Sequence, residues 1–131
     1  YRKYRLIFVN DQVLPYHLAI HNHWMVHHFR TDMGQHEWMR QEEEAFLRAP
    51  RDVFNEAHFA AFAQAAKAIG LDYCGMDCSL DQAGNIVVFE ANATMLVHEE
   101  INNAFVYKNP YIAKIKVAFD AMLGRLAGQA A

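Results

Sequence analysis

Runs of strand-forming residues and segments of helical periodicity divide the sequence into successive elements. Two strand-like runs, 1–10 and 13–22, lie on either side of the turn-forming residues Asp11 and Gln12, which predicts a β-hairpin. Pro15 in the second run cannot donate a backbone hydrogen bond, so it indicates an edge strand or a bulge.

Two helices are predicted in the middle of the chain. The first spans 35–47, where the run from Glu42 to Glu44 is expected to face solvent. The second begins at an N-cap supplied by Asp52 and ends at Gly70. The expected core-facing residues are Trp38, Met39, Ala45 and Phe46 in the first helix, and Phe54, Ala57, Ala61, Ala65 and Ala68 in the second.

A second strand pair and a final helix follow. The runs 72–81 and 85–92 flank the turn 82–84 and predict another hairpin. Asn109 and Pro110 mark the start of the last helix. Its expected apolar stripe consists of Ile112, Ile115, Phe119, Met122 and Leu126.

The order of these elements predicts an α+β fold in which helices pack on one face of an antiparallel sheet. With 131 residues and an apolar fraction of 53%, the chain is long enough to enclose a core within a single domain, residues 1–131. The net charge of −3 and the lack of a basic stripe argue against nucleic acid as a partner.

Several features of the sequence indicate a cytoplasmic protein. It has no run of about 18 apolar residues and no signal-peptide pattern, so no membrane association is expected. Cys74 and Cys78 share one predicted strand, and four strand residues span roughly 13 Å, too far for a disulfide bond. Free thiols suit a reducing compartment. The chain opens at Tyr1 rather than at Met, and we expect it to be the C-terminal part of a longer protein.

The second hairpin places two acidic residues opposite each other. A turn centred between Ala83 and Gly84 pairs Asp77 with Glu90. The same register pairs Ser79 with Val88 and Asp81 with Ile86. Because side chains alternate along a strand, two sets of residues fall on opposite faces. The apolar set is Met76, Cys78, Leu80, Val87, Phe89 and Ala91, and the polar set is Asp77, Ser79, Glu90 and Asn92.

Directly opposed carboxylates repel each other, since their Cβ atoms lie about 4.5–5.5 Å apart. A divalent cation offsets this repulsion most simply. Oxygen ligands from Asp77, Glu90 and Asn92, completed by water and phosphate, suit the six-coordinate preference of Mg²⁺. The alternative is a solvated polar face on which the carboxylate pair costs little stability.

Two stretches carry a family resemblance. Residues 70–94, GLDYCGMDCSLDQAGNIVVFEANAT, resemble the metal-binding end of the ATP-grasp ligases, in which an acidic residue on one strand precedes a Glu-x-Asn on the next. Asp77, Glu90 and Asn92 match this pattern, with the thirteen-residue step between the acids that is typical of D-alanine–D-alanine ligase-like members. The opening YRLIFVNDQVLPYHLA resembles the hairpin of prokaryotic glutathione synthetases. The resemblance implies the C-terminal lobe of an ATP-grasp enzyme.

The resemblance implies a reaction and its cofactors. ATP-grasp enzymes join a carboxylate to an amine or a similar nucleophile through an acyl-phosphate made from ATP. Two Mg²⁺ ions, replaceable by Mn²⁺, would be held by Asp77, Glu90 and Asn92 against the phosphates. A catalytic and cofactor-binding arginine on the first strand would contact the γ-phosphate or the acyl-phosphate. We expect Arg5 in this role and Arg2 as its rival, the alternative being an exposed arginine at a strand end.

Departures from the family pattern point to a different substrate. Ile20 stands where the glutathione synthetases carry another arginine, and 93–95 replaces the usual Thr-Ser-Pro-Gly type loop after Asn92. The substrate pair, a small-molecule carboxylate and an amine-type acceptor, is therefore unidentified. The resemblance also implies an upstream ATP-grasp lobe that binds the nucleotide, preceded in some proteins by tetratricopeptide repeats. This chain alone is expected to be inactive as an enzyme.

Histidines support a second hypothesis. The chain contains 8 of them. The candidate ligands are His17, His21 and His23, on one side of the second predicted strand, followed by His27 and His28. One zinc ion requires that strand to bend at Asn22, and lining of a substrate cleft or an ordinary structural role are the alternatives. His98, just past the Glu-x-Asn loop, is a candidate for substrate contact or for a structural role. The alternative function is a non-catalytic binding or interaction module with a histidine-rich metal site.

Overall fold

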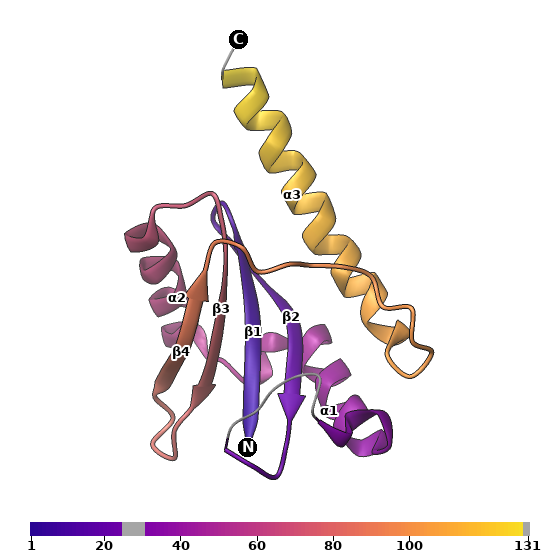
Figure 1. Ribbon diagram of the computed structural model, residues 1–131. Helices are drawn as coiled ribbons and strands as arrows, with labels where there is room; N and C mark the ends of the chain where they lie inside the picture. The colour runs from indigo at the N-terminus through magenta and orange to yellow at the C-terminus, as the bar shows by residue number, and fades with distance from the viewer. Residues whose placement is uncertain (25–30, 130–131) are drawn as a thin grey trace.

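The computed structural model describes residues 1–24 and 31–129, which form a four-stranded antiparallel sheet and three α-helices (Figure 1). The strands are β1 (Arg2–Val9), β2 (Gln12–Ile20), β3 (Tyr73–Leu80) and β4 (Ile86–Asn92). The helices are α1 (Glu37–Arg48), α2 (Glu56–Ile69) and α3 (Asn109–Gln129), with short 3₁₀ turns at Asp32–Gly34, Pro50–Asp52 and Val106–Lys108. The predicted α+β class with an antiparallel sheet is confirmed.

The strands lie in the order β2-β1-β3-β4, so β2 and β4 form the edges of the described sheet. The first hairpin turns at Asn10 and Asp11, one residue earlier than predicted, and Asn10 takes the left-handed φ of 52° that such tight turns require. The register of β1 and β2 shifts opposite Arg5, where Tyr16 is an extra residue. The prediction that Pro15 marks an edge strand or a bulge is confirmed in both respects.

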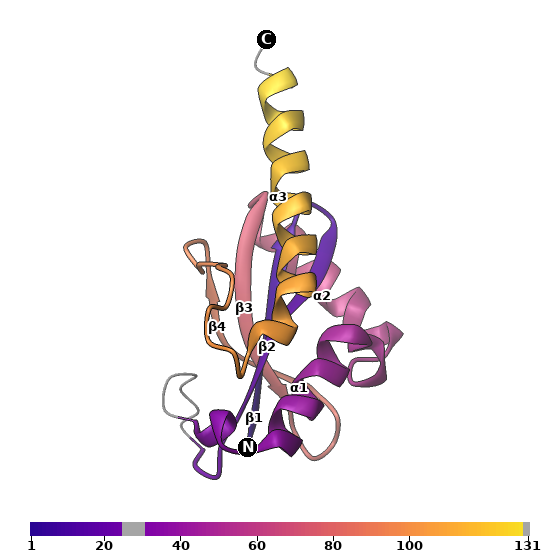
Figure 2. The same ribbon diagram turned by 90° about the vertical axis from the view of Figure 1, so that its right-hand side faces the viewer.

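Helices cover both faces of the sheet, and the prediction of helices on one face is wrong. One core cluster joins α1 and α2 to Tyr4, Leu6 and Phe8 of β1, and another joins α3 to Ile7 and Val9 of the same strand. In Figure 2, α1 and α2 lie on one side of the sheet and the segment leading into α3 on the other. The reason is that the run 6–9 is apolar at every position, so this central strand must be covered on both sides.

The two middle helices are rotated relative to the predicted orientations. Trp38 and Ala45 of α1 are exposed, whereas Glu43, expected in solvent, is fully buried beside Phe46 and Leu47. In α2, three alanines expected in the core are exposed: Ala57, Ala61 and Ala68. The residues that pack against the core are instead Phe59, Phe62, Ala65, Ala66 and Ile69. The large side chains determine which face of each helix is buried, and the stripe of alanines in α2 does not.

The ends of α2 are partly as predicted. Gly70 ends the helix in the left-handed conformation, at φ 68°, as expected. The N-cap is Asn55 rather than Asp52. Its side chain accepts a hydrogen bond from the His58 backbone N–H, while the His58 ring accepts one from the Asn55 N–H. This reciprocal pair satisfies two backbone donors of the first turn.

The last helix carries the predicted stripe, since Ile112, Ile115 and Met122 are buried and Phe119 and Leu126 pack beside them. The C-terminal half of α3 projects past the sheet (Figures 1 and 2). None of the helices in residues 1–24 and 31–129 combines the length and the apolar character needed to cross a membrane. Cys74 and Cys78 are buried free thiols, and burial raises the pKa of Cys78 to about 12.

Candidate functional site

A row of paired residues crosses the described sheet on the face opposite α1 and α2. Arg5 on β1 pairs with His17 on β2 and with Asp77 on β3, and Asp77 pairs with Glu90 on β4. Directly paired residues point to the same side of a sheet. The predicted opposition of Asp77 and Glu90 is therefore confirmed, and Arg5 and His17 extend it into one continuous row.

Asp77 is buried and neutralised by two cations from β1. Arg5 binds both carboxylate oxygens, with Nε 2.6 Å from Oδ1 and Nη2 2.8 Å from Oδ2, and Lys3 Nζ lies 3.1 Å from Oδ2. Burial raises the pKa of Asp77, but the hydrogen bonds and charge of Arg5, with those of Lys3, outweigh it and leave the pKa below its usual value. These cations offset the carboxylate repulsion, a task that the sequence analysis assigned to a metal ion.

Glu90 is exposed and, among residues 1–24 and 31–129, forms no ion pair like those that Asp77 makes with Arg5 and Lys3. Its Oε1 accepts a hydrogen bond of 3.0 Å from Asn92 Nδ2. The Oδ1 atom of Asn92 accepts from the Thr94 backbone N–H and from the Thr94 hydroxyl, each at 2.8 Å. The loop after β4 thus fixes the Asn92 side chain beside Glu90.

A bulge next to Asp77 changes the register nearer the turn. Asp77 pairs with Glu90, but Cys78 pairs with Val88, which leaves Phe89 as the extra residue. The predicted pairs of Ser79 with Val88 and of Asp81 with Ile86 are wrong, since Ser79 pairs with Val87 and Leu80 with Ile86. The prediction that Val87 shares an apolar face with Cys78 and Leu80 is also wrong, since Val87 pairs with Ser79, and both Val87 and Phe89 are exposed, Phe89 by 58%.

The rival arginine and the histidines are placed elsewhere. Arg2 forms a two-point ion pair with Glu42 of α1, on the other side of β1 from Arg5. His17 is buried in the polar row, whereas His21 and His23 follow β2, their ring centroids 5.6 Å apart. In residues 1–24 and 31–129, no three His, Cys, Asp or Glu side chains are grouped to hold a metal ion. His27 and His28 lie outside the described residues, and zinc binding stays a hypothesis.

Two clefts meet at this row. One, of about 800 Å³, is lined by the aromatic residues Trp24 and Phe89 together with Lys3, Asp77 and Glu90. The other, of about 690 Å³, is lined by Lys3, Arg5, Glu90 and Asn92, and by His17, His98, Glu99 and Glu100. Because Lys3 and Glu90 belong to both, they stand at the boundary between an aromatic cleft and a polar one.

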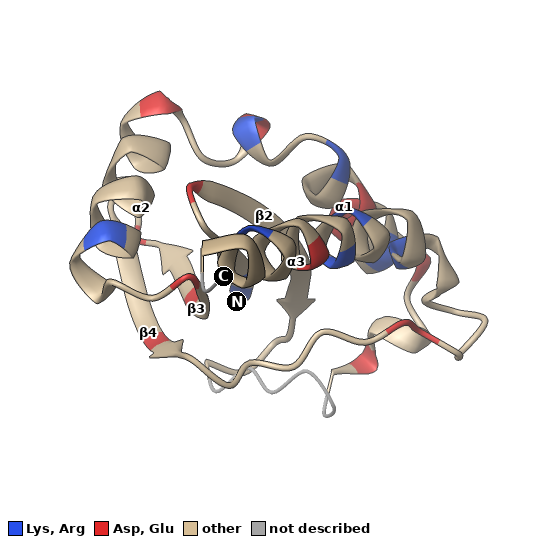
Figure 3. Ribbon diagram, turned by 90° about the horizontal axis from the view of Figure 1, so that it is seen from above, with Lys and Arg blue, Asp and Glu red and all other residues tan. Residues whose placement is uncertain are grey.

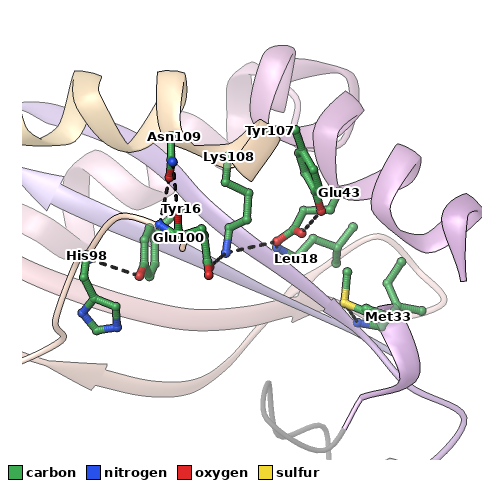
Figure 4. Close-up of polar contacts among 10 residues, drawn as sticks. Tyr16, Leu18, Met33, Glu43, His98, Glu100, Tyr107, Lys108 and Asn109 are labelled. Atoms are coloured by element: carbon green, nitrogen blue, oxygen red, sulfur yellow. Dashed lines mark hydrogen bonds and ion pairs between the residues drawn. The ribbon is translucent and has the colours of Figure 1, made fainter. Parts of the chain in front are cut away.

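A buried charge network, which the sequence analysis missed, borders the polar cleft (Figure 4). Glu43 of α1 accepts hydrogen bonds from the Leu18 backbone N–H, at 3.0 Å, and from the Tyr107 hydroxyl. The Nζ atom of Lys108 lies 2.8 Å from Glu100 Oε1 and 3.8 Å from Glu43 Oε1. Asn109 exchanges two hydrogen bonds with the Glu100 backbone. The network fixes one wall of the polar cleft to α1 and β2.

The residues of the row fit a magnesium ion in donor chemistry. Asp77, Glu90 and Asn92 offer hard oxygen ligands, and Glu90 is exposed. Lys3, Arg5, Asp77 and Glu90 together have a formal charge of zero, two positive and two negative. A bare cation therefore gains little there, whereas a cation that arrives with phosphate finds ligands for both charges. The Asn92 amide, whose nitrogen faces Glu90, has to rotate to present Oδ1 to a metal ion.

The wider surface and the comparisons add no competing identification. Figure 3 shows acidic and basic residues interspersed over the described elements, in keeping with the absence of a basic stripe. No family model, curated protein or solved structure matches the chain. The function is therefore inferred from the geometry of the site and from the resemblance in the sequence.

Proposed function

We propose that the chain is the C-terminal lobe of an ATP- and Mg²⁺-dependent ligase that joins a carboxylate to an amine-type acceptor through an acyl-phosphate. The observation that carries this proposal is the row from His17 through Arg5 and Asp77 to Glu90, with Asn92 beside it. It combines oxygen ligands for a cation with fixed cations for phosphate oxygens on one face of a sheet.

The two clefts support this proposal, because one can receive the nucleotide and the other the carboxylate substrate and its acceptor. The aromatic cleft offers Trp24 and Phe89 to a planar base, Lys3 to the phosphates and Glu90 to their Mg²⁺ ions. The polar cleft offers space for the carboxylate substrate and its acceptor. Transfer of a phosphoryl group would take place where the clefts meet.

Each residue of the row has a distinct role in this proposal. Asp77, Glu90 and Asn92 hold two Mg²⁺ ions, or Mn²⁺ in their place. When bound, the metal supplies neutralisation of phosphate charge during an in-line transfer. Arg5 is oriented by both oxygens of Asp77, so its guanidinium is a fixed cation for the γ-phosphate or the acyl-phosphate. Lys3 shares this task, and Arg2, tied to Glu42, keeps at most a secondary part in cofactor binding.

Partners and location complete the proposal. An upstream ATP-grasp lobe, with or without repeat domains before it, would bind the rest of the nucleotide and cover Val87 and Val88, two apolar side chains that β4 exposes. The free thiols Cys74 and Cys78 are in keeping with a reducing, cytoplasmic setting.

Titration calorimetry of the 131-residue chain tests the proposal. We expect Mg²⁺ alone to bind weakly and Mg²⁺ with ATP to bind measurably, because the row has no net charge. Glu90→Gln removes an exposed ligand and should weaken binding of Mg²⁺·ATP by about tenfold or more, while the melting temperature stays nearly unchanged.

Glu56→Gln is the matched control, because Glu56 is an exposed glutamate on α2 that pairs with Arg51 far from the row. It should bind Mg²⁺·ATP as the unmodified chain does. If Glu90→Gln binds Mg²⁺·ATP as tightly as the control, the proposal is wrong.

A further inference from the structure

A separate, mostly apolar cavity of about 550 Å³ lies between the segment 93–97 and α3. Its apolar lining includes Tyr73, Met95, Ile115 and Phe119. This volume lies within the range of small-molecule sites, roughly 300–1,000 Å³.

The wall of the cavity is anchored to the sheet. Met95 is buried directly over Gly75, where an added Cβ would lie 2.4 Å from the Met95 sulfur. The Tyr73 hydroxyl donates a hydrogen bond to the Met95 carbonyl, and the Tyr73 ring packs edge-on against Phe119 with centroids 5.3 Å apart. These contacts keep the segment in place and the cavity open without a ligand.

The cavity adjoins the polar cleft of the proposed ligase site. Thr94, Met95 and Leu96 line both spaces. Thr94 is also the residue that fixes Asn92 through two hydrogen bonds. Leu96, at the shared boundary, is 71% exposed, an apolar side chain that a ligand spanning the two spaces would cover.

Charge distinguishes the two ends of such a ligand. The cavity is apolar inside, with Lys116 and Asp120 at its rim, and Lys116 is held 3.0 Å from Glu99. The polar cleft next to it holds the cations Arg5 and Lys3 and the carboxylates of Glu90, Glu99 and Glu100. Glu99 and Glu100 are already paired, with Lys116 and Lys108. An apolar chain therefore fits the cavity, and an anionic head group at its end would point toward Arg5 in the row.

We propose that this cavity binds the apolar portion of the carboxylate substrate, an aliphatic acid whose chain lies between Met95 and Phe119 and whose carboxylate faces Arg5. This inference rests on the proposed function and names its substrate class. It explains why the loop after Asn92 carries Met95, Leu96 and Val97, a run of apolar residues next to a polar site.

Methyl NMR of the chain labelled at its methionines tests the inference, with octanoate as the probe. We expect the Met95 signal to shift saturably, while the signals of Met33 and Met76, buried elsewhere, stay in place. Val97→Trp, at a residue that lines the cavity, should weaken octanoate binding by about tenfold or more. Val117→Trp is the control, because Val117 is an exposed residue of α3 outside the cavity lining.

A second variant guards against misfolding of the first. Leu96→Ser changes a side chain that is already exposed, so it should keep the fold and weaken octanoate binding several-fold. The inference is wrong if octanoate leaves the Met95 signal in place, shifts the Met33 and Met76 signals equally, or binds Leu96→Ser, Val97→Trp and Val117→Trp alike.

Addition of Mn²⁺ and ADP separates this inference from the proposed function. We expect Mn²⁺ to broaden the octanoate protons beside the carboxylate more than its terminal methyl. If Mn²⁺·ADP binds at the row and octanoate does not enter the cavity, this inference fails and the ligase proposal stands. If octanoate enters the cavity while Glu90→Gln binds Mn²⁺·ADP as tightly as the unmodified chain does, the ligase proposal fails and the cavity remains an apolar acid site.

Discussion

The two edge strands of the described sheet differ in how their outer edges are covered by side chains. On β2, the outward Leu18 N–H donates to Glu43, and the Ile20 N–H contacts the Met33 sulfur at 3.4 Å. β4 carries exposed apolar residues instead: Val87, Val88 and Phe89. An unpaired strand edge can pair with another chain. The edge at β2 is closed by side chains of the same chain, whereas β4 presents exposed apolar side chains. We therefore infer different roles for the two edges.

The difference is clearest in one glutamate from each side. Glu43 is fully buried and bonded to Leu18, Tyr107 and Lys108. Glu90 is exposed on the edge strand and held by Asn92. The first arrangement stabilises the fold, and its buried carboxylate is not accessible to a ligand. The second leaves a carboxylate within reach of a ligand, which is what the proposed function needs.

Removal of the sealing glutamate should have the largest effect. Glu43→Ala leaves Lys108 buried without one of its anionic neighbours, and it leaves the Leu18 N–H without an acceptor. Lys108 keeps its closer partner, Glu100, so the main cost comes from the Leu18 N–H and the Tyr107 hydroxyl, which both lose their acceptor. At about 1–3 kcal/mol for each such group, we expect a loss of about 2–5 kcal/mol in the free energy of unfolding. Urea denaturation measures it.

Glu44→Ala provides the comparison on the same helix, because Glu44 is only half-buried. It should change the free energy of unfolding by no more than about 0.5 kcal/mol. Equal effects of the two substitutions would show that the sealed edge does not depend on Glu43.

A substitution beside the open edge should have an intermediate effect. Gly75 pairs with Asn92, and a Cβ there would lie 2.4 to 2.9 Å from the Met95 side chain. Gly75→Ala should therefore cost about 1–3 kcal/mol of stability through overpacking. Gly124→Ala, in α3 with open space around it, should instead stabilise by about 0.5–1 kcal/mol. Thermal unfolding of both variants checks the signs, and a stable Gly75→Ala protein would contradict the tight contact.

The buried carboxylates on the two sides should respond to pH in opposite directions. The pKa of Asp77 is lowered from 3.8, so its stabilisation is complete above that pH and is lost as the pH falls through the folded-state pKa. Burial raises the pKa of Glu43 from 4.5, against the charge of Lys108 and the hydrogen bonds from Tyr107 and Leu18. The folded state therefore loses stability as the pH rises from 4.5 through the raised pKa.

Asp77→Asn and Glu43→Gln test this contrast by unfolding across acidic pH. The cost of Asp77→Asn should shrink as the pH drops below 3.8, and the cost of Glu43→Gln should grow as the pH drops toward 4.5. Parallel pH trends for the two variants would refute the opposite environments.

Polar substitution on the open edge should have the smallest effect. Val88 is 50% exposed and Ile20 on the sealed edge is 3% exposed. Val88→Thr should change the free energy of unfolding by no more than about 0.5 kcal/mol, whereas Ile20→Thr should cost several times as much. A large loss in Val88→Thr would mean that β4 is covered in solution, which analytical ultracentrifugation would detect as association.

Local sequence pattern predicted much of the secondary structure and one decisive pair. The strand-forming runs, Gly70, the stripe of α3 and the opposition of Asp77 and Glu90 all depend on residues close together in sequence. Arg5 was predicted to contact phosphate, but its ion pair with Asp77 was not predicted. That ion pair depends on the pairing of β1 with β3, which joins segments about 70 residues apart.

The errors have two physical origins. Glu43 was predicted to face solvent because its partners, Lys108 and Tyr107, are more than 60 residues away in the sequence. The bulge at Phe89 reversed the expected faces near the turn, and a bulge changes the register without a sequence signature as clear as that of a turn. Burial of a charged residue depends on distant partners, which local periodicity does not contain.

The most direct test of the central claim is the position at which Mn²⁺ with ADP broadens the backbone amide signals of the chain. We predict broadening centred on Asp77, Glu90 and the residues after Asn92, weaker broadening around Glu43 at the sealed edge, and loss of the effect in Glu90→Gln. Broadening centred on His21 and His23, or an unchanged pattern in Glu90→Gln, would contradict it.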